Sequence, residues 1–209
     1  MILIGHRGKH NDGTEPNSMD ALKAGLEQGY GIETDFRDYN GKLVLSHDRP
    51  GKEAVLADEF FDVAGRHLAC TLAINVKSDG IGDLIKEEID KHKITNYFAF
   101  DMSVPQMLEY YKLGVRFFTR QSEFEKSPVL YKEAAGVWLD TFENDDWLDE
   151  ELVSRYIKEG KDVCIVSPEL HGRVPDSLWD KIASWKVDTA RLMLCTDLLE
   201  EAKMKLGRV

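Results

Sequence analysis

The pattern that decides the fold first occurs in residues 1–8, which read Met1-Ile2-Leu3-Ile4-Gly5-His6-Arg7-Gly8. Residues 2–5 form a short apolar run of the kind that predicts a buried strand. Two ionisable side chains, His6 and Arg7, follow directly where that strand would end. A glycine at position 8 lets the backbone approach a ligand closely. We therefore expect a buried strand whose carboxyl end carries chemically active groups.

The same pattern recurs along the chain, with segments of helical periodicity between the apolar runs. The strand candidates are Ile2–Gly5, Gly31–Phe36, Cys70–Val76, Tyr97–Phe100, Val115–Thr119, Gly136–Leu139, Asp162–Val166 and Arg191–Cys195. The helix candidates are Ser18–Gln28, Ala57–Ala64, Ile81–His92, Val104–Leu113, Val129–Ala134, Asp149–Glu159, Asp176–Trp185 and Leu198–Leu206. Strands that alternate with helices predict an α/β fold with parallel strands.

Local punctuation refines these boundaries. Ser18 is expected to cap the first helix, and Ser103 with Gln106 is expected to form a capping box. The pair Asn40-Gly41 predicts a hairpin turn into an extra extended segment, Lys42–Leu45.

Two architectures fit this alternation, a closed (β/α)₈ barrel and a doubly wound open sheet. A barrel gathers the carboxyl ends of its strands into one ring, where active sites of that fold lie, whereas an open sheet spreads them along an edge. We therefore expect one TIM-barrel domain over residues 1–209, although a typical barrel takes about 250 residues. Polar residues follow each strand candidate: His6 and Arg7, Glu33 and Asp35, Asn75 and Lys77, Asp101, Arg120, Asp140, Ser167 and Glu169, and Asp197.

The overall charge excludes some partners. The chain has 27 basic and 38 acidic residues, a net charge of −11, which argues against nonspecific binding to nucleic acid or to anionic membranes. No apolar stretch approaches the ~20 residues of a membrane span, and no secretory leader is visible. Cys70, Cys164 and Cys195 lie in apolar runs and suit buried free thiols in a reducing compartment. A cytoplasmic protein is expected.

Glu33 and Asp35 form the first candidate site. Residues i and i+2 on a strand share one face, so both carboxylates would point the same way. Two adjacent carboxylates need a cation or an arginine to neutralise them, and oxygen-only ligation suits Mg²⁺ or Ca²⁺. The alternative is a solvated strand, in which Arg37 completes a plain ladder of ion pairs.

Two histidines and an arginine supply further chemistry. Arg7 offers a planar fork that matches phosphate oxygens, and His6 can exchange a proton near neutral pH. His47, in Ser46-His47-Asp48 after the hairpin segment, is a second acid or base. Taken alone, each of these motifs also suits a surface turn.

In their order and spacing, these motifs resemble the glycerophosphodiester phosphodiesterase family. The resemblance is strongest over residues 4–48 and looser beyond them. It runs through His6-Arg7-Gly8, Glu15-Pro16-Asn17-Ser18, Gly31-Ile32-Glu33-Thr34-Asp35, Asn40-Gly41, His47-Asp48, Asn75-Val76-Lys77, Ala99-Phe100-Asp101 and Cys195-Thr196-Asp197.

The resemblance implies a (β/α)₈ barrel that hydrolyses phosphodiesters with a divalent cation, Mg²⁺ or Ca²⁺. Position by position, His6 and His47 look like the acid–base pair. Arg7 and Lys77 look like phosphate ligands, and Glu33 and Asp35 look like metal ligands.

Three features depart from the family pattern. Asn75 stands where relatives usually have a glutamate as a third metal ligand; an amide oxygen can still coordinate a hard cation but brings no charge. The segment 49–67 is much shorter than the usual insertion after the His-Asp motif. The loop Ser167–Arg173 carries Glu169, His171 and Arg173, which are expected either to bind a polar headgroup or to form an exposed polar loop.

The expected function is hydrolysis of glycerophosphodiesters, or of a related small polar phosphodiester, to a phosphomonoester such as glycerol 3-phosphate and an alcohol. This would be an activity of lipid metabolism with a small-molecule substrate. One alternative is a barrel that binds phosphorylated ligands with weak or no turnover, because Asn75 replaces a metal-binding glutamate. Another is a metal-dependent aldolase or isomerase, which would use Glu33 and Asp35 but would not need two histidines. The oligomeric state does not follow from the sequence.

Overall fold

The structure is a computed structural model that describes residues 1–10 and 13–207. It consists of two compact units, residues 6–117 and residues 118–209 together with residues 1–5, which are described in turn. None of the helices in the described residues combines the length and the apolar content that a membrane-spanning helix needs.

In the unit of residues 6–117, the strands form a mixed sheet. Strands β2 (Gly31–Tyr39), β5 (Leu72–Val76) and β6 (Tyr97–Phe100) run parallel in that order. On the other side of β2, β3 (Lys42–Leu45) and β4 (Val55–Leu56) add antiparallel strands. The parallel register places Asp35 opposite Asn75, so the carboxyl ends of β2 and β5 bring their polar side chains together.

The hairpin between β2 and β3 turns at Asn40-Gly41, as the sequence predicts. Both residues have positive φ, 50° and 74°, which is the backbone of a two-residue hairpin turn. The register pairs Phe36 with Leu45 and Tyr39 with Lys42. β3 therefore returns along β2 and delivers the residues after Leu45 to the level of Asp35.

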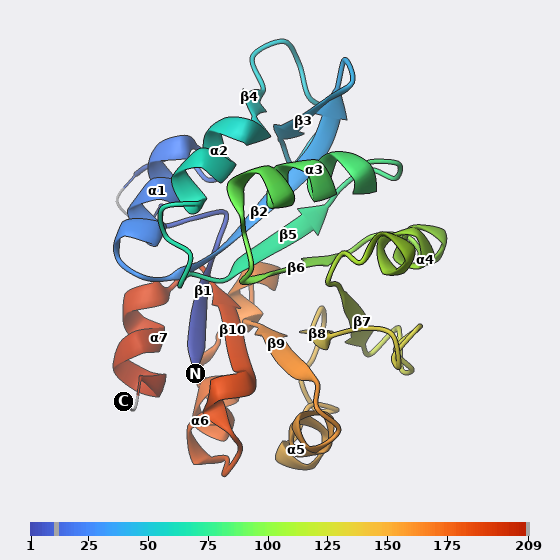
Figure 1. The fold of residues 1–209 in the computed structure, drawn as a ribbon. Coiled ribbons are helices and arrows are strands. Elements are labelled where there is room, and N and C mark those ends of the chain that lie inside the picture. Colours follow the sequence, from blue (N-terminus) through green and yellow to red (C-terminus); the bar gives the residue numbers. More distant parts are fainter. Residues whose placement is uncertain (11–12, 208–209) are drawn as a thin grey trace. The chain divides into compact units, whose positions relative to one another are not determined.

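The helices of this unit lie against the sheet (Figure 1). They are α1 (Met19–Glu27), α2 (Ala57–Ala64), α3 (Gly82–His92) and α4 (Val104–Leu113). Ser18 caps α1 by accepting a hydrogen bond from Ala21 N, as expected. Phe60 and Phe61 of α2 pack against Phe36 of β2. The three rings are fully buried, and their centroids lie within 6.1 Å of one another. The segment 49–67 holds only β4, α2 and short connections.

In the other unit, the strands form an all-parallel sheet in the order β1 (Ile2–His6), β10 (Leu192–Thr196), β9 (Asp162–Val166), β8 (Gly136–Asp140) and β7 (Phe118–Ser122). Near-continuous apolar burial along β8, β9 and β10 is typical of parallel strands covered on both faces. The helical elements are α5 (Glu150–Lys158), α6 (Asp176–Ser184), α7 (Leu199–Leu206) and the short 3₁₀ turns η1 (Pro168–His171) and η2 (Thr189–Arg191). Cys70, Cys164 and Cys195 are buried free thiols, as expected.

The structure corrects three local predictions. The expected helix Val129–Ala134 is a series of turns, because Leu130 adopts a left-handed φ of 52° that a right-handed helix cannot contain. The expected strand Val115–Thr119 lies three residues later, as β7. The capping box at Ser103 does not form, because the Ser103 hydroxyl donates to Asp79 and the Gln106 side chain bonds Gly80 N and Glu109 instead.

Candidate active site

The turn after β1 is shaped to place Arg7. Arg7 has a left-handed φ of 54°, and its carbonyl accepts a hydrogen bond from Asn17 N at 2.9 Å. Gly8 packs on the backbone of α1, where an added Cβ would lie 2.6 Å from the carbonyl carbon of Ala21. No other residue fits this contact, so the glycine fixes the path of the chain beside the site.

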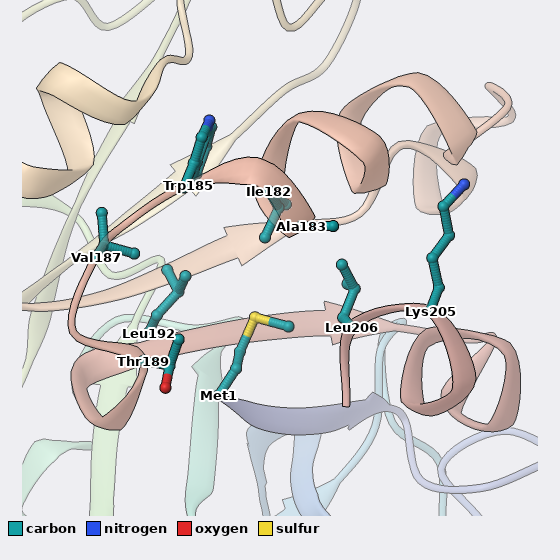
Figure 2. Close-up of a pocket in the computed structure, with 9 residues that line it drawn as sticks. All are labelled: Met1, Ile182, Ala183, Trp185, Val187, Thr189, Leu192, Lys205 and Leu206. Atoms are coloured by element: carbon teal, nitrogen blue, oxygen red, sulfur yellow. The ribbon is translucent and has the colours of Figure 1, made fainter. Parts of the chain in front are cut away.

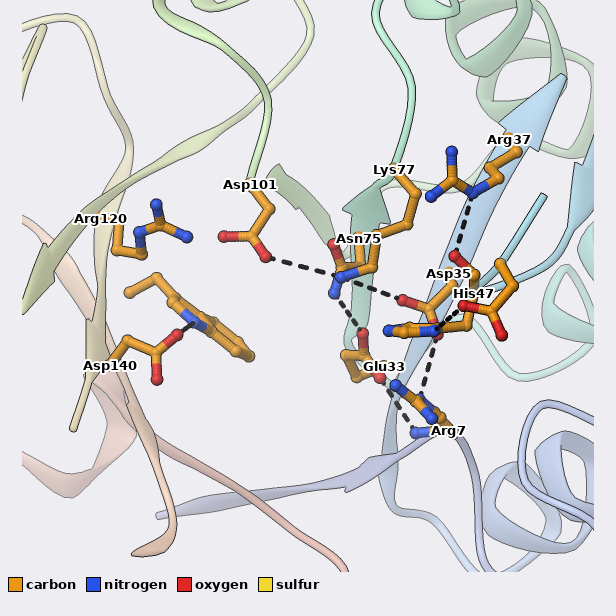
Figure 3. Close-up of polar contacts among 12 residues, drawn as sticks. Arg7, Glu33, Asp35, Arg37, His47, Asn75, Lys77, Asp101, Arg120 and Asp140 are labelled. Carbon is orange, nitrogen blue, oxygen red and sulfur yellow. Dashed lines mark hydrogen bonds and ion pairs between the residues drawn. The ribbon is translucent and has the colours of Figure 1, made fainter. Parts of the chain in front are cut away.

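Glu33 and Asp35 lie on β2 and are buried, with 1% and 0% of their surface exposed. Glu33 accepts a hydrogen bond from Arg7 N at 3.0 Å. Asp35 forms ion pairs with Arg7 Nε at 3.2 Å and with Lys77 Nζ at 3.4 Å. The two carboxylates therefore share one buried cluster with both proposed phosphate ligands (Figure 3). The solvated strand that the sequence left open is excluded.

Asn75 and Lys77 reach this cluster from β5. Asn75 Nδ2 donates to Glu33 Oε1 at 2.9 Å, and Figure 3 shows the two side chains pointing toward each other. Lys77 lies between two carboxylates, Asp35 and Asp101, the latter at 3.8 Å. Alternate residues of β5 thus face the same side as alternate residues of β2, as the strand period requires.

Burial of the two carboxylates has an electrostatic consequence. Burial raises the pKa of Glu33 above its ordinary value of 4.5, and the neighbouring charge of Asp35 raises this pKa further. The charge of His6 and the hydrogen bonds from Asn75 and Arg7 oppose that shift without cancelling it. A cation bound beside Glu33 would lower this pKa, because an opposite charge favours the ionised carboxylate.

The donor atoms fit a hard divalent cation. Within the described residues, the buried atoms Asp35 Oδ1 and Asn75 Oδ1 accept no hydrogen bond, although Asp35 Oδ1 lies 3.4 Å from the Lys77 ammonium. A buried oxygen without a donor, as at Asn75, is costly and calls for a partner. Together with Glu33 they make an all-oxygen set of the kind that Mg²⁺ and Ca²⁺ prefer.

His47 is held at the edge of the cluster by the hairpin. Ser46 N donates to Asp35 O at 3.0 Å, and Arg37 Nε donates to His47 O at 3.0 Å. His47 Nδ1 bonds Asp48 Oδ1 at 2.9 Å, and about half of the imidazole side chain (46%) is exposed. Arg37 thus fixes the His47 backbone and does not form the carboxylate ladder that the sequence left as an alternative.

Two further residues of this cluster lie in motifs that the sequence analysis quotes without giving them a role in the site. Asn17 Nδ2 donates to Asp35 Oδ2 at 2.7 Å, while its Oδ1 accepts from Thr34 Oγ1. Asp101 adopts a left-handed φ of 68° directly after β6 and pairs with Lys77. The signals were present, since Asn17 belongs to the motif of residues 15–18 and Asp101 follows a strand.

All of these groups belong to the unit of residues 6–117, whereas the loop Ser167–Arg173 belongs to the other unit. There, Glu169 accepts hydrogen bonds from the Ser167 and Thr196 hydroxyls and from Asp197 N. Arg173 donates to Asp145 at 3.0 Å and to the Thr141 carbonyl. Their polar groups therefore stabilise the loop itself, and their role in substrate binding stays a prediction.

His171, on the same loop, pairs with the end of β8. Its Nε2 lies 2.7 Å from Asp140 Oδ1, and its ring centroid lies 4.9 Å from that of Phe142. A buried carboxylate thus sets the orientation of the imidazole, whose substrate role also stays a prediction.

One pocket lies in the unit formed by residues 1–5 and 118–209 (Figure 2). It adjoins the amino ends of β1 and β10 through Met1 and Leu192 and has a volume of about 130 Å³. Its lining is mostly apolar, with Trp185, Val187 and Leu206 among it. Because catalytic groups of parallel α/β folds gather at the carboxyl ends of the strands, this pocket is not the candidate site.

Comparison with known proteins supports the fold. No protein-family model matches the sequence, and no curated protein matches it. A glycerophosphodiester phosphodiesterase from Parabacteroides distasonis aligns with a TM-score of 0.74 at 17% identity, over 99% of this chain and 96% of that chain. The enzyme of the same name from Thermotoga maritima aligns with a TM-score of 0.70 at 18% identity, over 98% of both chains.

A mutant tryptophan synthase α-subunit from Pyrococcus furiosus is also similar, with a TM-score of 0.57 at 16% identity, over 99% of this chain and 96% of that chain. Both kinds of neighbour are TIM barrels. The α/β fold is confirmed, whereas closure of the strands into a barrel and a single domain over residues 1–209 stay predictions. The chain has the fold of the glycerophosphodiester phosphodiesterases, and the resemblance seen in its motifs is confirmed at that level.

Proposed function

We propose that this protein is a divalent-cation-dependent phosphodiesterase. It hydrolyses glycerophosphodiesters, or a related small polar phosphodiester, to a phosphomonoester such as glycerol 3-phosphate and an alcohol. The observation that carries the proposal is the convergence of Arg7, Lys77, Glu33 and Asp35 in one buried cluster, with oxygen atoms that accept no hydrogen bond.

The two cationic side chains suit the phosphate. The Arg7 and Lys77 side chains are each partly exposed, 27% and 21%, so both can reach a ligand without leaving Asp35. A guanidinium and an ammonium on the same anion offset the negative charge that its two non-bridging oxygens share and that grows in the transition state. Arg7 supplies two directed donors and Lys77 a point charge.

The histidines suit proton transfer. Because Asp48 holds Nδ1 of His47, the other ring nitrogen, Nε2, is the atom that takes or gives a proton. His6 contributes the second imidazole, and its charge acts on Glu33. One histidine removes the proton from the attacking oxygen and the other protonates the leaving alcohol.

Glu33, Asp35 and Asn75 would hold the cation. When bound, such an ion polarises a phosphoryl oxygen and neutralises charge in the transition state. The protein's part is to hold the two carboxylates in place, through the hydrogen bonds from Arg7 N, Asn17 and Asn75.

A role in lipid metabolism in the cytoplasm belongs to the same proposal. The net charge of −11 and the buried free thiols support it, and they fit a small-molecule substrate better than nucleic acid.

The test is a panel of glycerophosphodiesters with Mg²⁺, Ca²⁺ or Mn²⁺ and with a chelator, with products followed by ³¹P NMR. We expect a phosphomonoester that forms only with added cation. Binding of a diester without turnover would support the alternative, in which the protein binds phosphorylated ligands but does not hydrolyse them because Asn75 replaces a metal-binding glutamate. Neither binding nor turnover across the panel would refute both, and would leave the aldolase or isomerase class for the same carboxylates.

A further inference from the structure

A second group of ligand atoms lies between α2 and α3, which are neighbours in the fold (Figure 1). Asp58 occupies the first turn of α2, and Glu88 and His92 lie one turn apart on α3. One carboxylate oxygen of each acid and one ring nitrogen of His92 lie within 4.8 Å of one another. None of these residues belongs to the proposed active site.

The geometry of the three atoms resembles a metal centre. His92 Nε2 lies 2.7 Å from Asp58 Oδ1 and 3.4 Å from Glu88 Oε2. In tetrahedral zinc sites, with bonds of about 2.0–2.2 Å, neighbouring ligand atoms lie about 3.3 Å apart. The His92 ring is already oriented, since it stacks on Phe61 with centroids 6.2 Å apart, and only 12% of the side chain is exposed.

Two further observations bear on a ligand at this cluster. Glu88 Oε2 is buried and accepts no hydrogen bond within the described residues, and its ion pairs with His92 Nε2 and Lys91 Nζ are long, at 3.4 Å and 3.7 Å. A pocket of about 270 Å³, lined by Asp58 and Glu88 among others, adjoins these groups and gives a path for an ion and its waters. Glu88 therefore meets its neighbours in this cluster only through ion pairs that are longer than an ordinary hydrogen bond.

Lys91 holds the place of a cation in this cluster. Its Nζ lies 2.5 Å from Asp58 Oδ1 and 3.7 Å from Glu88 Oε2. The hydrogen bond from Lys91 lowers the pKa of Asp58, and the bond from His92 lowers it further. One ammonium neutralises one of the two carboxylates, so a negative charge remains for a metal ion.

We infer that Asp58, Glu88 and His92 form a second metal site that takes a borderline divalent ion of the Zn²⁺ type. The mixed nitrogen and oxygen set distinguishes it from the all-oxygen set at Glu33 and Asp35, because imidazole suits zinc whereas carboxylate, carbonyl and water suit Mg²⁺ or Ca²⁺. Three protein ligands leave the fourth position to water from the pocket.

The site would act as a brace. Both α2 and α3 pack against β3, and Leu43 of that strand lines the same pocket. An ion that joins the two helices stabilises the strand that leads to His47. We therefore expect Zn²⁺ to raise the thermal stability of the protein while turnover with Mg²⁺ stays unchanged.

The test is calorimetric titration of the full chain with Zn²⁺ in saturating Mg²⁺, together with the visible spectrum of the Co²⁺ form. We expect one site with the absorption of tetrahedral Co²⁺. His92→Gln keeps a donor toward Asp58 but removes the imidazole ligand, and it should weaken binding about tenfold or more, the size of effect that altering one ligand environment has in metal sites. Lys91→Met removes the competing ammonium and should tighten binding several-fold.

Two controls make the outcome decisive. The double variant Glu33→Gln, Asp35→Asn should keep the Zn²⁺ site, which separates it from the active site. Glu88→Gln repeats the test if His92→Gln does not fold. Equal Zn²⁺ affinity in the wild type and in a folded His92→Gln or Glu88→Gln variant would overturn the inference, as would Zn²⁺ binding that disappears in the double variant.

Discussion

Two groups of polar residues that follow strands, one in each unit, differ in how their hydrogen bonds are satisfied. In residues 118–209, Glu169 accepts from three donors of its own unit, and Arg173 donates to Asp145 and Thr141. In residues 6–117, the buried Asn75 Oδ1 accepts no hydrogen bond, and Asp35 Oδ1 meets only the ammonium of Lys77, at 3.4 Å. The contrast is between these two groups of residues and not between whole units, because residues 118–209 also hold buried acceptors without a hydrogen bond, Thr119 Oγ1 and Glu123 Oε2.

This difference separates residues that maintain a loop from residues that wait for a ligand. A carboxylate with every lone pair occupied contributes to stability, and its removal should cost folding free energy. A buried carboxylate with a free oxygen costs stability and is retained for another reason. The predictions below test this division.

The largest effect should follow loss of the carboxylates of β2. Glu33→Ala or Asp35→Ala should reduce cation-stimulated turnover by about 10³-fold or more, the factor given by several kcal/mol of lost charge stabilisation. Excess cation should partly rescue either single variant but not the double. If calorimetry finds the same cation affinity in the wild type and in both single variants, Glu33 and Asp35 are not the cation ligands.

The second-largest effect on turnover should follow loss of either histidine. His6→Ala and His47→Ala should each lower kcat by roughly 10²-fold or more, typical of a lost general acid or base. Cation affinity should persist, since neither ring is a proposed ligand. The comparison needs a diester with a poor leaving group. Near-wild-type turnover in both variants would disprove the acid–base assignment.

Replacing Asn75 should change the affinity for the cation. As it stands, Glu33 and Asp35 supply two negative charges and Asn75 supplies none, whereas the family pattern that the sequence resembles has a glutamate at this position. Asn75→Glu should tighten cation binding by about tenfold or more, because a charge at ligand distance is worth several kcal/mol before desolvation offsets part of it. The measurement is a cation titration of the wild type and of Asn75→Glu in the same buffer. Equal affinity in the two proteins would mean that the side chain at position 75 does not contact the ion.

A smaller effect, on stability alone, is expected from the loop in the other unit. Arg173→Met should lower the free energy of unfolding by about 1.5–3 kcal/mol, since hydrogen bonds to a charged group are lost. Chemical denaturation measures that change, and kcat and KM should not move. A raised KM at constant kcat would instead assign Arg173 to the substrate, as its sequence context predicts.

The smallest effect concerns pH. The pKa of Glu33 is raised in the native chain, so without cation the native state holds its proton to a higher pH than the unfolded chain, where this group titrates near 4.5. The free energy of unfolding should therefore fall as pH rises through the interval above 4.5. Glu33→Gln should remove this slope, and added Mg²⁺ should offset it. A slope that persists in Glu33→Gln belongs to another group.

Much of this molecule could be predicted from its sequence. Short apolar runs ended by polar residues located β6 and β9 to the residue, and the i, i+2 rule placed Glu33 and Asp35 on one face. Asn40-Gly41 predicted the hairpin because few other pairs tolerate two positive φ angles in succession. These are local rules that depend on a few neighbouring residues.

The remainder depends on contacts between distant residues. The Ser103 hydroxyl donates to Asp79, 24 positions away, and therefore does not cap its own helix. No local sequence pattern shows this competing hydrogen bond. The motif of residues 15–18 contains Asn17, but its bond to Asp35 follows from the turn at Arg7 and from the packing of Gly8 on α1. The loop residues Glu169 and Arg173 looked available because their partners come from other strands.

The β2–β3 hairpin limits how this chain can evolve. Loops ordinarily tolerate insertions and deletions, but a single residue gained or lost between Phe36 and Leu45 would exchange the two faces of β3. It would also shift the anchor of Ser46 N on Asp35, and with it the imidazole of the next residue, His47. Only changes of two residues at once preserve the register. A library of such variants should therefore alternate between active and inactive lengths, with the odd lengths failing.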